Sequence, residues 1–427
     1  MTTTIFRTSD LVILKQKVLN WIQRFNTFSF LDNHSYPSGL STQEILVGAG
    51  SRFTLKQQEA TGSDAFRKLD DFTRRFKGEW IFGHLGYEFG SSPKAAGTLV
   101  HKGFDDICFF VPEIVMRLNE SGFEISANDP DSVYNAIMET QLSGPVHAPL
   151  EKPFLQGRLD RETYIATIRK LQEHILRGDC YEINFCQEFF AENASIDPVE
   201  TYLKLAAVSP APFAGLYRVD EHWLACASPE RYIKKTGGTI FSQPIKGTAK
   251  REPGDSTQDA EQANLLYHSA KDRSENVMIV DLVRNDFSKF CREGSVRVDE
   301  LYGIYIFPQV YQMISTISGE LRPGTSFAGI IEASFPMGSM TGAPKKRVME
   351  LIEQYEQQRR GLFSGTIGYI APDGDFDFNV VIRSVLYDAR QRYLSLPAGS
   401  GITFYSDPAL EWEECLVKAA AMRQVFE

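Results

Sequence analysis

The sequence has few cysteines, and their arrangement excludes a disulfide-stabilised scaffold. Among 427 residues there are six cysteines, with neither a CxxC pair nor the regular spacing of a disulfide framework. We therefore expect reduced, mostly buried thiols in a cytoplasmic protein. The six are Cys108, Cys180, Cys186, Cys226, Cys291 and Cys415.

Positive charge is also scarce. The 45 Lys and Arg residues are outnumbered by 55 Asp and Glu residues, so the formal net charge is −10. This balance argues against a broad electrostatic attraction to nucleic acid or to an anionic membrane, and we expect neither as a partner. An anionic substrate would have to be held by local cations or by a metal ion.

Long hydrophobic segments are missing as well. No apolar run approaches the roughly 18–20 residues that cross a bilayer. The first ten residues, MTTTIFRTSD, contain no basic region followed by an apolar stretch. We therefore expect no membrane span and no signal peptide.

Prolines and glycines concentrate at 143–157, SGPVHAPLEKPFLQG, which predicts a linker. This linker would separate an N-terminal subdomain, 1–145, from a second part, 150–427. The chain is long enough for two domains of ordinary size. We expect the chemistry to lie in the second part.

Strand and helix patterns occur in both parts. Aromatic-rich runs at 78–90 and 106–118 are typical of strands. Asp160 can cap a helix that ends at Gly178, and a strand-like run follows at 181–190. The mixture predicts an α+β or α/β fold.

Lys246 is the residue whose neighbours point most directly to chemistry. It lies in a predicted loop, PIKGT at 244–248, between apolar residues and a glycine. In a partly dry site the pKa of its amine would fall, and a neutral amine can act as a nucleophile or a base. The bland alternative is an ordinary surface lysine beside a turn.

Glu230 follows Ser228 and Pro229 at the end of a strand-like run. It is either a fixed general acid or a turn carboxylate, and the residues alone favour the turn. Glu230 precedes Lys246 by 16 residues, a spacing that suits two neighbouring strands. An acid and an amine could then face one cavity.

The segment 271–290 predicts a helix that is apolar on most sides and hence largely buried. Burying its polar residues costs free energy unless they are paired or bound to a metal. A buried Arg–Asp network and a metal site both satisfy this condition. The polar residues are Glu275, Asp281, Arg284, Asn285 and Asp286.

A last helix is predicted to begin at Ser406-Asp407-Pro408. Glu411, Glu414 and Lys418 would share one of its faces. Like charges one turn apart repel by a few tenths of a kcal/mol, which is trivial on a wet surface. The other interpretation is that a hard divalent cation binds both carboxylates.

Glycine-rich loops and one arginine complete the candidates. The loop at 335–347, with Lys345, leads into a predicted helix and could bind an anion. The loop at 396–402 offers backbone amides for a carboxylate. Arg383 is predicted within the apolar strand 379–385 and needs a carboxylate partner from the protein or from a ligand.

Read in order, these segments resemble the chorismate-utilising enzymes. The resemblance covers nearly the whole chain, more weakly before residue 150, where GHLGYEFG at 83–90 is also similar. It implies an α+β fold, a β-sandwich of large antiparallel sheets flanked by helices in two subdomains. The matching runs are SPE (228–230), PIKGT (244–248), SENVMIVDLVRND (274–286), FPMGSMTGAPK (335–345), SGTIGY (364–369), VIRS (381–384), AGSGI (398–402) and EWEECLVKA (411–419).

Within this family the chain most resembles the aminodeoxychorismate synthases, which carry a lysine in PIKGT. Anthranilate synthases typically have alanine in place of Lys246. Isochorismate and salicylate synthases place a base lysine at the position that corresponds to Glu182. Anthranilate synthase component I, or a non-catalytic chorismate-binding subunit, are the competing interpretations.

The resemblance implies a role for each matching residue. Glu275 and Glu414, with Glu411 close by, would hold a Mg²⁺ ion that fixes the ring carboxylate of chorismate. Glu230 would protonate the departing C4 hydroxyl, and Lys246 would attack C2. The second carboxylate would be received by Tyr369, Arg383 and the amides of Ala398, Gly399 and Gly401, with Thr248, Thr341, Gly342 and Lys418 lining the same pocket.

The same resemblance implies the partners. Ammonia would add at C4 and expel Lys246. We see no glutamine-hydrolysing segment, so ammonia would come from a glutamine amidotransferase subunit or from free ammonium. One departure is Gln312, where relatives commonly carry a histidine; a glutamine cannot shuttle a proton near neutral pH.

Overall fold

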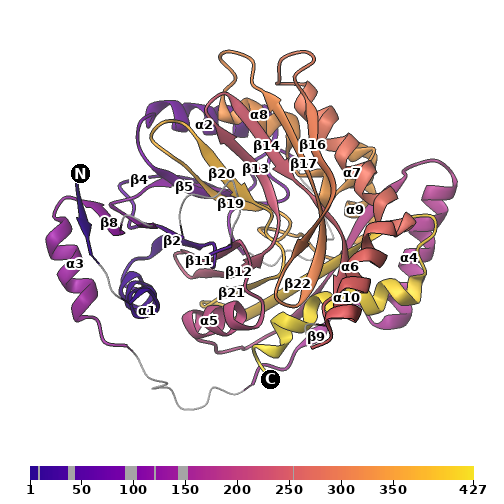
Figure 1. Cartoon of the computed structure of the whole chain (residues 1–427), viewed down its shortest axis with the longest axis horizontal. Helices are drawn as coiled ribbons and strands as arrows, with labels where there is room; N and C mark the ends of the chain where they lie inside the picture. Colours follow the sequence, from indigo (N-terminus) through magenta and orange to yellow (C-terminus); the bar gives the residue numbers. More distant parts are fainter. Residues whose placement is uncertain (8–9, 37–43, 92–102, 120–121, 143–151, 253) are drawn as a thin grey trace.

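The computed structural model describes residues 1–427 except 8–9, 37–43, 92–102, 120–121, 143–151 and 253. Two large antiparallel sheets lie face to face, and helices cover their outer faces (Figure 1). The predicted α+β sandwich is therefore confirmed. Most of the predicted linker at 143–157 lies outside the described residues.

The first sheet runs through the molecule from the N-terminal strand to the cavity described below. Every pairing between its strands is antiparallel. In spatial order it consists of β1 (Thr2–Phe6), β8 (Gly122–Ala127), β7 (Ile114–Asn119), β3 (Ile45–Ala49), β2 (Thr27–Asp32), β11 (Phe213–Val219), β12 (His222–Ser228), β21 (Ser384–Asp388), β22 (Tyr393–Ile402), β10 (Glu182–Ala191) and β18 (Gly342–Ala343), with β9 (Gln156–Gly157) paired to β10.

The second sheet is also antiparallel throughout. Each sheet contains strands from both 1–145 and 150–427, so the two predicted parts of the chain share both sheets. In spatial order the second sheet consists of β15 (Ile245–Lys250), β17 (Val310–Glu320), β14 (Thr239–Gln243), β13 (Arg231–Thr236), β20 (Phe376–Asn379), β19 (Thr366–Ile370), β5 (Ile81–Leu85), β6 (Ile107–Val111) and β4 (Phe53–Gln57), with β16 (Arg297–Ile306) paired to β17.

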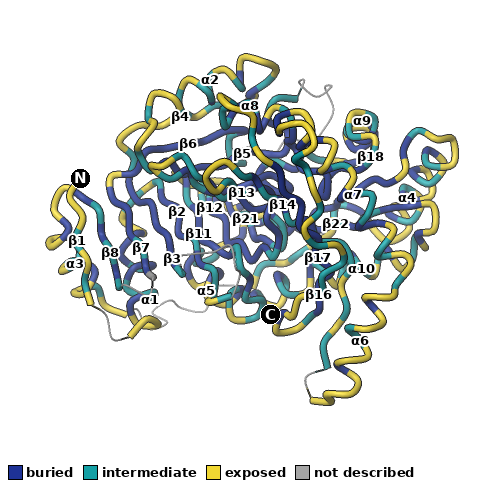
Figure 2. The backbone as a smooth tube through the Cα atoms, turned by 45° about the horizontal axis from the view of Figure 1, so that its top comes forward, coloured by how far each residue is buried: buried dark blue, intermediate teal, exposed yellow. Residues whose placement is uncertain are grey.

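Aromatic and branched side chains join the two sheets. Phe82 and Phe110 of the second sheet pack with Leu46, Val115 and similar residues of the first in one buried cluster. Because side chains alternate across a strand, the other face of each sheet is free to pack against helices. Figure 2 shows the resulting pattern of buried strands inside and exposed helix faces outside.

Helices cover each outer face of the sandwich. Those on the first sheet are α1 (Leu11–Ile22), α3 (Pro130–Glu139), α4 (Arg161–Leu176), α5 (Pro198–Val208), α9 (Lys345–Tyr355) and α10 (Pro408–Gln424). Those on the second are α2 (Gly62–Arg75), α7 (Ala270–Ser288) and α8 (Phe327–Ser334), while α6 (Ser256–His268) packs beside β17 through Leu266.

Local signals in the sequence place several of these elements. Asp160 accepts a hydrogen bond from the Thr163 amide and caps α4, as predicted. Asp407 caps α10 in the same way, with Pro408 in its first turn. Among the helices of the described residues, none is long and apolar enough to span a membrane.

Candidate active site

A cavity of about 850 Å³ lies where β10, β15 and β22 meet α7 and α10. Most of the predicted site residues line it, although they come from distant parts of the sequence. The predicted residues that line the cavity are Glu230, Lys246, Thr248, Glu275, Arg383, Ala398, Gly399, Gly401, Glu414 and Lys418.

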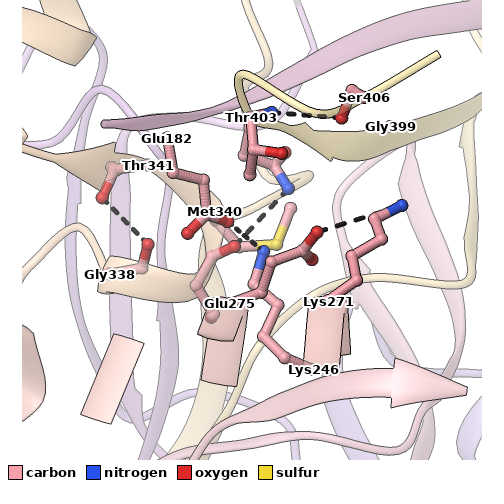
Figure 3. Close-up of polar contacts among 12 residues, drawn as sticks. Glu182, Lys246, Lys271, Glu275, Gly338, Met340, Thr341, Gly399, Thr403 and Ser406 are labelled. Carbon is pink, nitrogen blue, oxygen red and sulfur yellow. Dashed lines mark hydrogen bonds and ion pairs between the residues drawn. The ribbon is translucent and has the colours of Figure 1, made fainter. Parts of the chain in front are cut away.

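Lys246 lies on the short strand β15, so the predicted loop is wrong. The pairing of β15 with β17 is irregular between Ile245 and Thr248, and Gly247 has a φ of +97°. This irregularity interrupts the regular ladder at the lysine. Its side chain reaches Glu182 on β10, and the Lys246 Nζ to Glu182 Oε1 distance is 2.5 Å (Figure 3).

The ion pair changes the expected chemistry of Lys246. Burial on its own would lower the pKa of the Lys246 amine, but the carboxylates of Glu182 and Glu275 outweigh burial and raise it. Our prediction of a lowered pKa is therefore wrong, and Lys246 is an ammonium ion in this geometry. Glu182 is only 1% exposed. Spacing could not reveal this contact, because it depends on how β10 and β15 meet.

Glu230 lies just after β12, in the same cavity as Lys246. It is 4% exposed, and burial raises the pKa of its carboxyl to about 7, with Ser339 and Lys246 acting in the opposite direction. A carboxyl with this pKa carries a proton for much of the time near neutral pH. General acid catalysis requires such a group.

Two more buried carboxylates face each other across Lys271. Burial raises the pKa of Glu275 to about 7, with Lys246 opposing. The Lys271 Nζ lies 3.9 Å from Glu275 Oε1 and 3.5 Å from Glu411 Oε1. Among the described residues, Glu275 Oε1 and Glu411 Oε2 are buried without a hydrogen-bond partner. Glu411 is 2% exposed, so a wet helix face is excluded for it.

Glu414 is paired along its own helix. Lys418 Nζ lies 2.6 Å from Glu414 Oε1 and donates to the Gly399 carbonyl at 3.0 Å. Burial would raise the pKa of Glu414, but Lys418 holds it below its usual range. The predicted repulsion on this face is thus relieved by lysines, with Lys271 serving Glu411.

The acidic side chains fit a divalent metal in chemistry but do not form an assembled site. Within the described ranges, no group of three or more His, Cys, Asp or Glu side chains is arranged to hold a metal ion. However, the unpartnered oxygens of Glu275 and Glu411 are hard carboxylate donors, which Mg²⁺ prefers, and Mg²⁺ needs only one or two of them.

Arg383 does not lie within a strand, which corrects the sequence prediction. It sits between β20 and β21 with a φ of +52°, in the left-handed region that costs a non-glycine residue energy. In the part of the chain that the structure describes, its guanidinium has no hydrogen-bond or ion-pair partner. Burial lowers the pKa of Arg383. The cation is therefore free to meet a ligand carboxylate in the cavity.

The predicted glycine loop at 396–402 is part of β22, which pairs with β10. Its glycines provide close packing. A Cβ at Gly399 would lie 2.4 Å from the Cys186 sulfur, and one at Gly401 would lie 2.8 Å from Lys246 Nζ. The predicted loop is wrong, because this backbone is an extended strand, while the binding of a carboxylate by its amides stays a prediction.

Four predicted residues lie outside the cavity lining, namely Glu411, Tyr369, Thr341 and Gly342. Tyr369, on β19, lines a smaller cavity of about 70 Å³ with Asp32 and Glu44. Thr341 and Gly342 support β10 from its edge, since the Thr341 carbonyl accepts the Asn184 amide at 2.7 Å and Gly342 pairs with Ile183.

Lys345 does not offer an anion site, because it already has protein partners. Its Nζ lies 2.7 Å from Asp286 Oδ2 and donates to the Ser334 carbonyl. Gln312, on β17, lines the cavity and accepts a hydrogen bond from the Thr248 hydroxyl at 3.2 Å.

The fold and the cavity together define the class of protein. Carboxyls with raised pKa, a buried amine and an arginine without a partner among the described residues converge in one large pocket, which is typical of an enzyme site for a small anionic substrate.

The chain belongs to the chorismate binding enzyme family, whose sequence profile matches residues 31–424. Aminodeoxychorismate synthase component 1 of Escherichia coli (strain K12) is 40% identical over 348 residues, which are 81% of this chain and 76% of that protein. The corresponding protein of Klebsiella aerogenes is 40% identical over 263 residues, and the match spans 62% of this chain and 57% of that protein.

Solved structures show the same fold. Anthranilate synthase component I from Streptococcus pneumoniae TIGR4 aligns with a TM-score of 0.75 over 91% of this chain and 93% of that one, at 22% identity. At this identity the likeness concerns the fold alone.

Proposed function

We propose that the protein is an aminodeoxychorismate synthase component I, which converts chorismate and ammonia to 4-amino-4-deoxychorismate. The observation that carries this proposal is the buried Lys246 amine, which shares one cavity with the carboxyl of Glu230. The 40% identity to curated component 1 proteins supports it.

Chorismate is a dianion, and the cavity supplies cations for both carboxylates. Arg383 has no protein partner among the described residues and would bind one carboxylate. Lys418, held by Glu414 and the Gly399 carbonyl, adds positive charge nearby. A Mg²⁺ ion on Glu275 and Glu414, with Glu411 close by, would neutralise and orient the other carboxylate.

Two side chains would carry out the substitution. Glu230 donates its proton to the C4 hydroxyl, which leaves as water. Lys246, after losing one proton, attacks C2 and forms a covalent amine adduct. Ammonia then adds at C4, the bond between Lys246 and C2 breaks, and the extra proton on the new amine returns to Glu230.

Ammonia would reach this site from a partner glutaminase, the glutamine amidotransferase subunit, or from free ammonium. We place the protein in the cytoplasm on the basis of this pathway.

The direct test is the product formed from chorismate, Mg²⁺ and ammonium, separated by chromatography and identified by mass. We expect aminodeoxychorismate from the wild-type protein and none from Lys246→Ala, with chorismate binding largely kept. Lys250→Ala is the comparison, because Lys250 lies on the same strand and at the same cavity but its side chain is exposed, so it should keep amination activity.

The alternatives predict other results. Anthranilate as the product would identify an anthranilate synthase. Binding of chorismate without any turnover would indicate a non-catalytic subunit. Unchanged turnover in Lys246→Ala would exclude the covalent role.

A further inference from the structure

We propose that Glu182 is the positioning residue that holds Lys246 as an ammonium ion and accepts its proton when the amine attacks the substrate. This inference rests on the proposed function, because it assigns the proton that Lys246 must lose.

The geometry of the pair carries the inference. Glu182 Oε1 lies 2.5 Å from Lys246 Nζ, and both side chains are removed from water, with exposures of 1% and 10%. In the described part of the chain, Glu182 Oε2 is buried and has no hydrogen-bond partner. A buried carboxylate with one unpartnered oxygen has room to accept a proton without breaking another hydrogen bond.

The position of the amine is restricted from the opposite side. A Cβ at residue 401 would lie 2.8 Å from Lys246 Nζ and 2.9 Å from Glu182 Oε1, so any larger residue there would force the ends of these two side chains to shift. Gly401 is paired with Asn184 in the β10–β22 ladder, and the backbone cannot retreat easily. The pair is therefore held between two strands.

Other charges act on Lys246 from farther away. Glu275 on α7, Glu230 after β12 and Glu414 on α10 all influence the amine, but the ion pair that the structure contains is with Glu182. The Glu182 carboxylate is the nearest acceptor, and in a buried site proton transfer within such a pair avoids separating charge.

The proton balance closes over one turnover. The Lys246 ammonium gives a proton to Glu182, and the freed lone pair forms the bond to C2. When ammonia later displaces Lys246, the neutral amine leaves and recovers its proton from Glu182. The protein then returns to its starting state without exchanging this proton with solvent.

The experiment measures two reactions of the full chain as a function of pH and compares their midpoints, the pH at which each reaches half of its maximal rate. The first is for acetylation of Lys246 by acetic anhydride, followed on the Lys246 peptide by mass spectrometry. The second is for covalent adduct formation with chorismate and Mg²⁺ in a single turnover without ammonia. The variants are Glu182→Gln, which cannot accept a proton, and Glu182→Asp, which can.

In the wild type we expect adduct formation to persist well below the acetylation midpoint, because Glu182 takes the proton internally. In Glu182→Gln the acetylation midpoint should fall by about 1–3 pH units, since a neighbouring negative charge is lost. The two midpoints should then coincide. Glu182→Asp should restore their separation.

The control is Glu188→Gln, a change at another buried carboxylate of β10 that pairs with Arg158 instead. It should move neither midpoint. Coincident midpoints in the wild type, or an unchanged acetylation midpoint in folded Glu182→Gln, would overturn the inference. Absence of any adduct in the wild type would instead refute the covalent role of Lys246, and absence of any aminated product with ammonium would refute the proposed function, while acetylation still reports on the ion pair.

Discussion

The protonation of Glu230 should make the free energy of unfolding depend on pH. Burial raises the pKa of this carboxyl from 4.5 to about 7 in the folded state. The native protein therefore holds a proton that the unfolded chain releases between these two pH values. Stability contributed by this group must fall as pH rises through that window, and the loss is complete above about pH 7.

The magnitude follows from the size of this difference. A change of about 2.5 in pKa corresponds to about 3 kcal/mol. Between about pH 5 and about pH 8.5, most of this penalty, about 2–3 kcal/mol, develops in the wild type. Glu230→Gln is neutral at both pH values and has no such penalty. Glu275 titrates in the same range in both proteins, so its effect cancels in the comparison.

The assay is urea unfolding of the wild type and Glu230→Gln at the two pH values. We expect the variant to lose about 2–3 kcal/mol less than the wild type between the lower and the higher pH. Glu413→Gln, at an exposed position of α10, should behave as the wild type. The same Glu230→Gln protein should lose about 10²–10⁴-fold in kcat. Identical pH dependence of stability in both proteins would refute a neutral, buried Glu230.

Three further predictions concern binding and access. Arg383→Gln should weaken chorismate binding by about 1.5–3 kcal/mol, measured by calorimetry, because the guanidinium has no other described partner; unchanged affinity would exclude its carboxylate role. Gly401→Ala should lower kcat by about tenfold or more, since the added methyl displaces Lys246 from Glu182. Circular dichroism should show that the fold is intact. Full activity would contradict the close packing. Chelation of divalent metal should abolish turnover and raise the chorismate dissociation constant. Glu275→Gln should reproduce both effects without a chelator. Turnover that does not depend on metal would refute the metal role.

Much of the fold could be predicted because local signals were strong. The aspartate caps of α4 and α10 and the aromatic strand runs are short-range patterns, and each appears where expected. What could not be predicted was which strands become neighbours. Each sheet joins strands from both ends of the chain, and this pairing depends on tertiary packing.

The same limit applies to the site. Most of the predicted residues in the matching motifs line one cavity, but their electrostatics depend on contacts that sequence spacing does not encode. Lys246 was expected to be neutral because its neighbours in sequence are apolar. Its neighbour in space is Glu182, 64 residues away, and this carboxylate reverses the direction of the pKa shift.

Of two predicted binding residues, Arg383 lines the large cavity and Tyr369 does not. Both belong to apolar runs in the sequence. Tyr369 faces the smaller cavity beside Trp80, with ring centroids 5.7 Å apart. Arg383 has a left-handed backbone conformation, lies outside the strands and lines the large cavity. Backbone strain of this kind leaves no signal in a single sequence.

The mechanism depends on a bond between the amine of Lys246 and C2 of chorismate. The most direct measurement is peptide mass spectrometry of the wild-type protein after incubation with chorismate and Mg²⁺ in the absence of ammonia. We predict that the peptide containing Lys246 gains the mass of chorismate less one water. An unmodified Lys246 in a preparation that aminates chorismate when ammonium is added would contradict the mechanism.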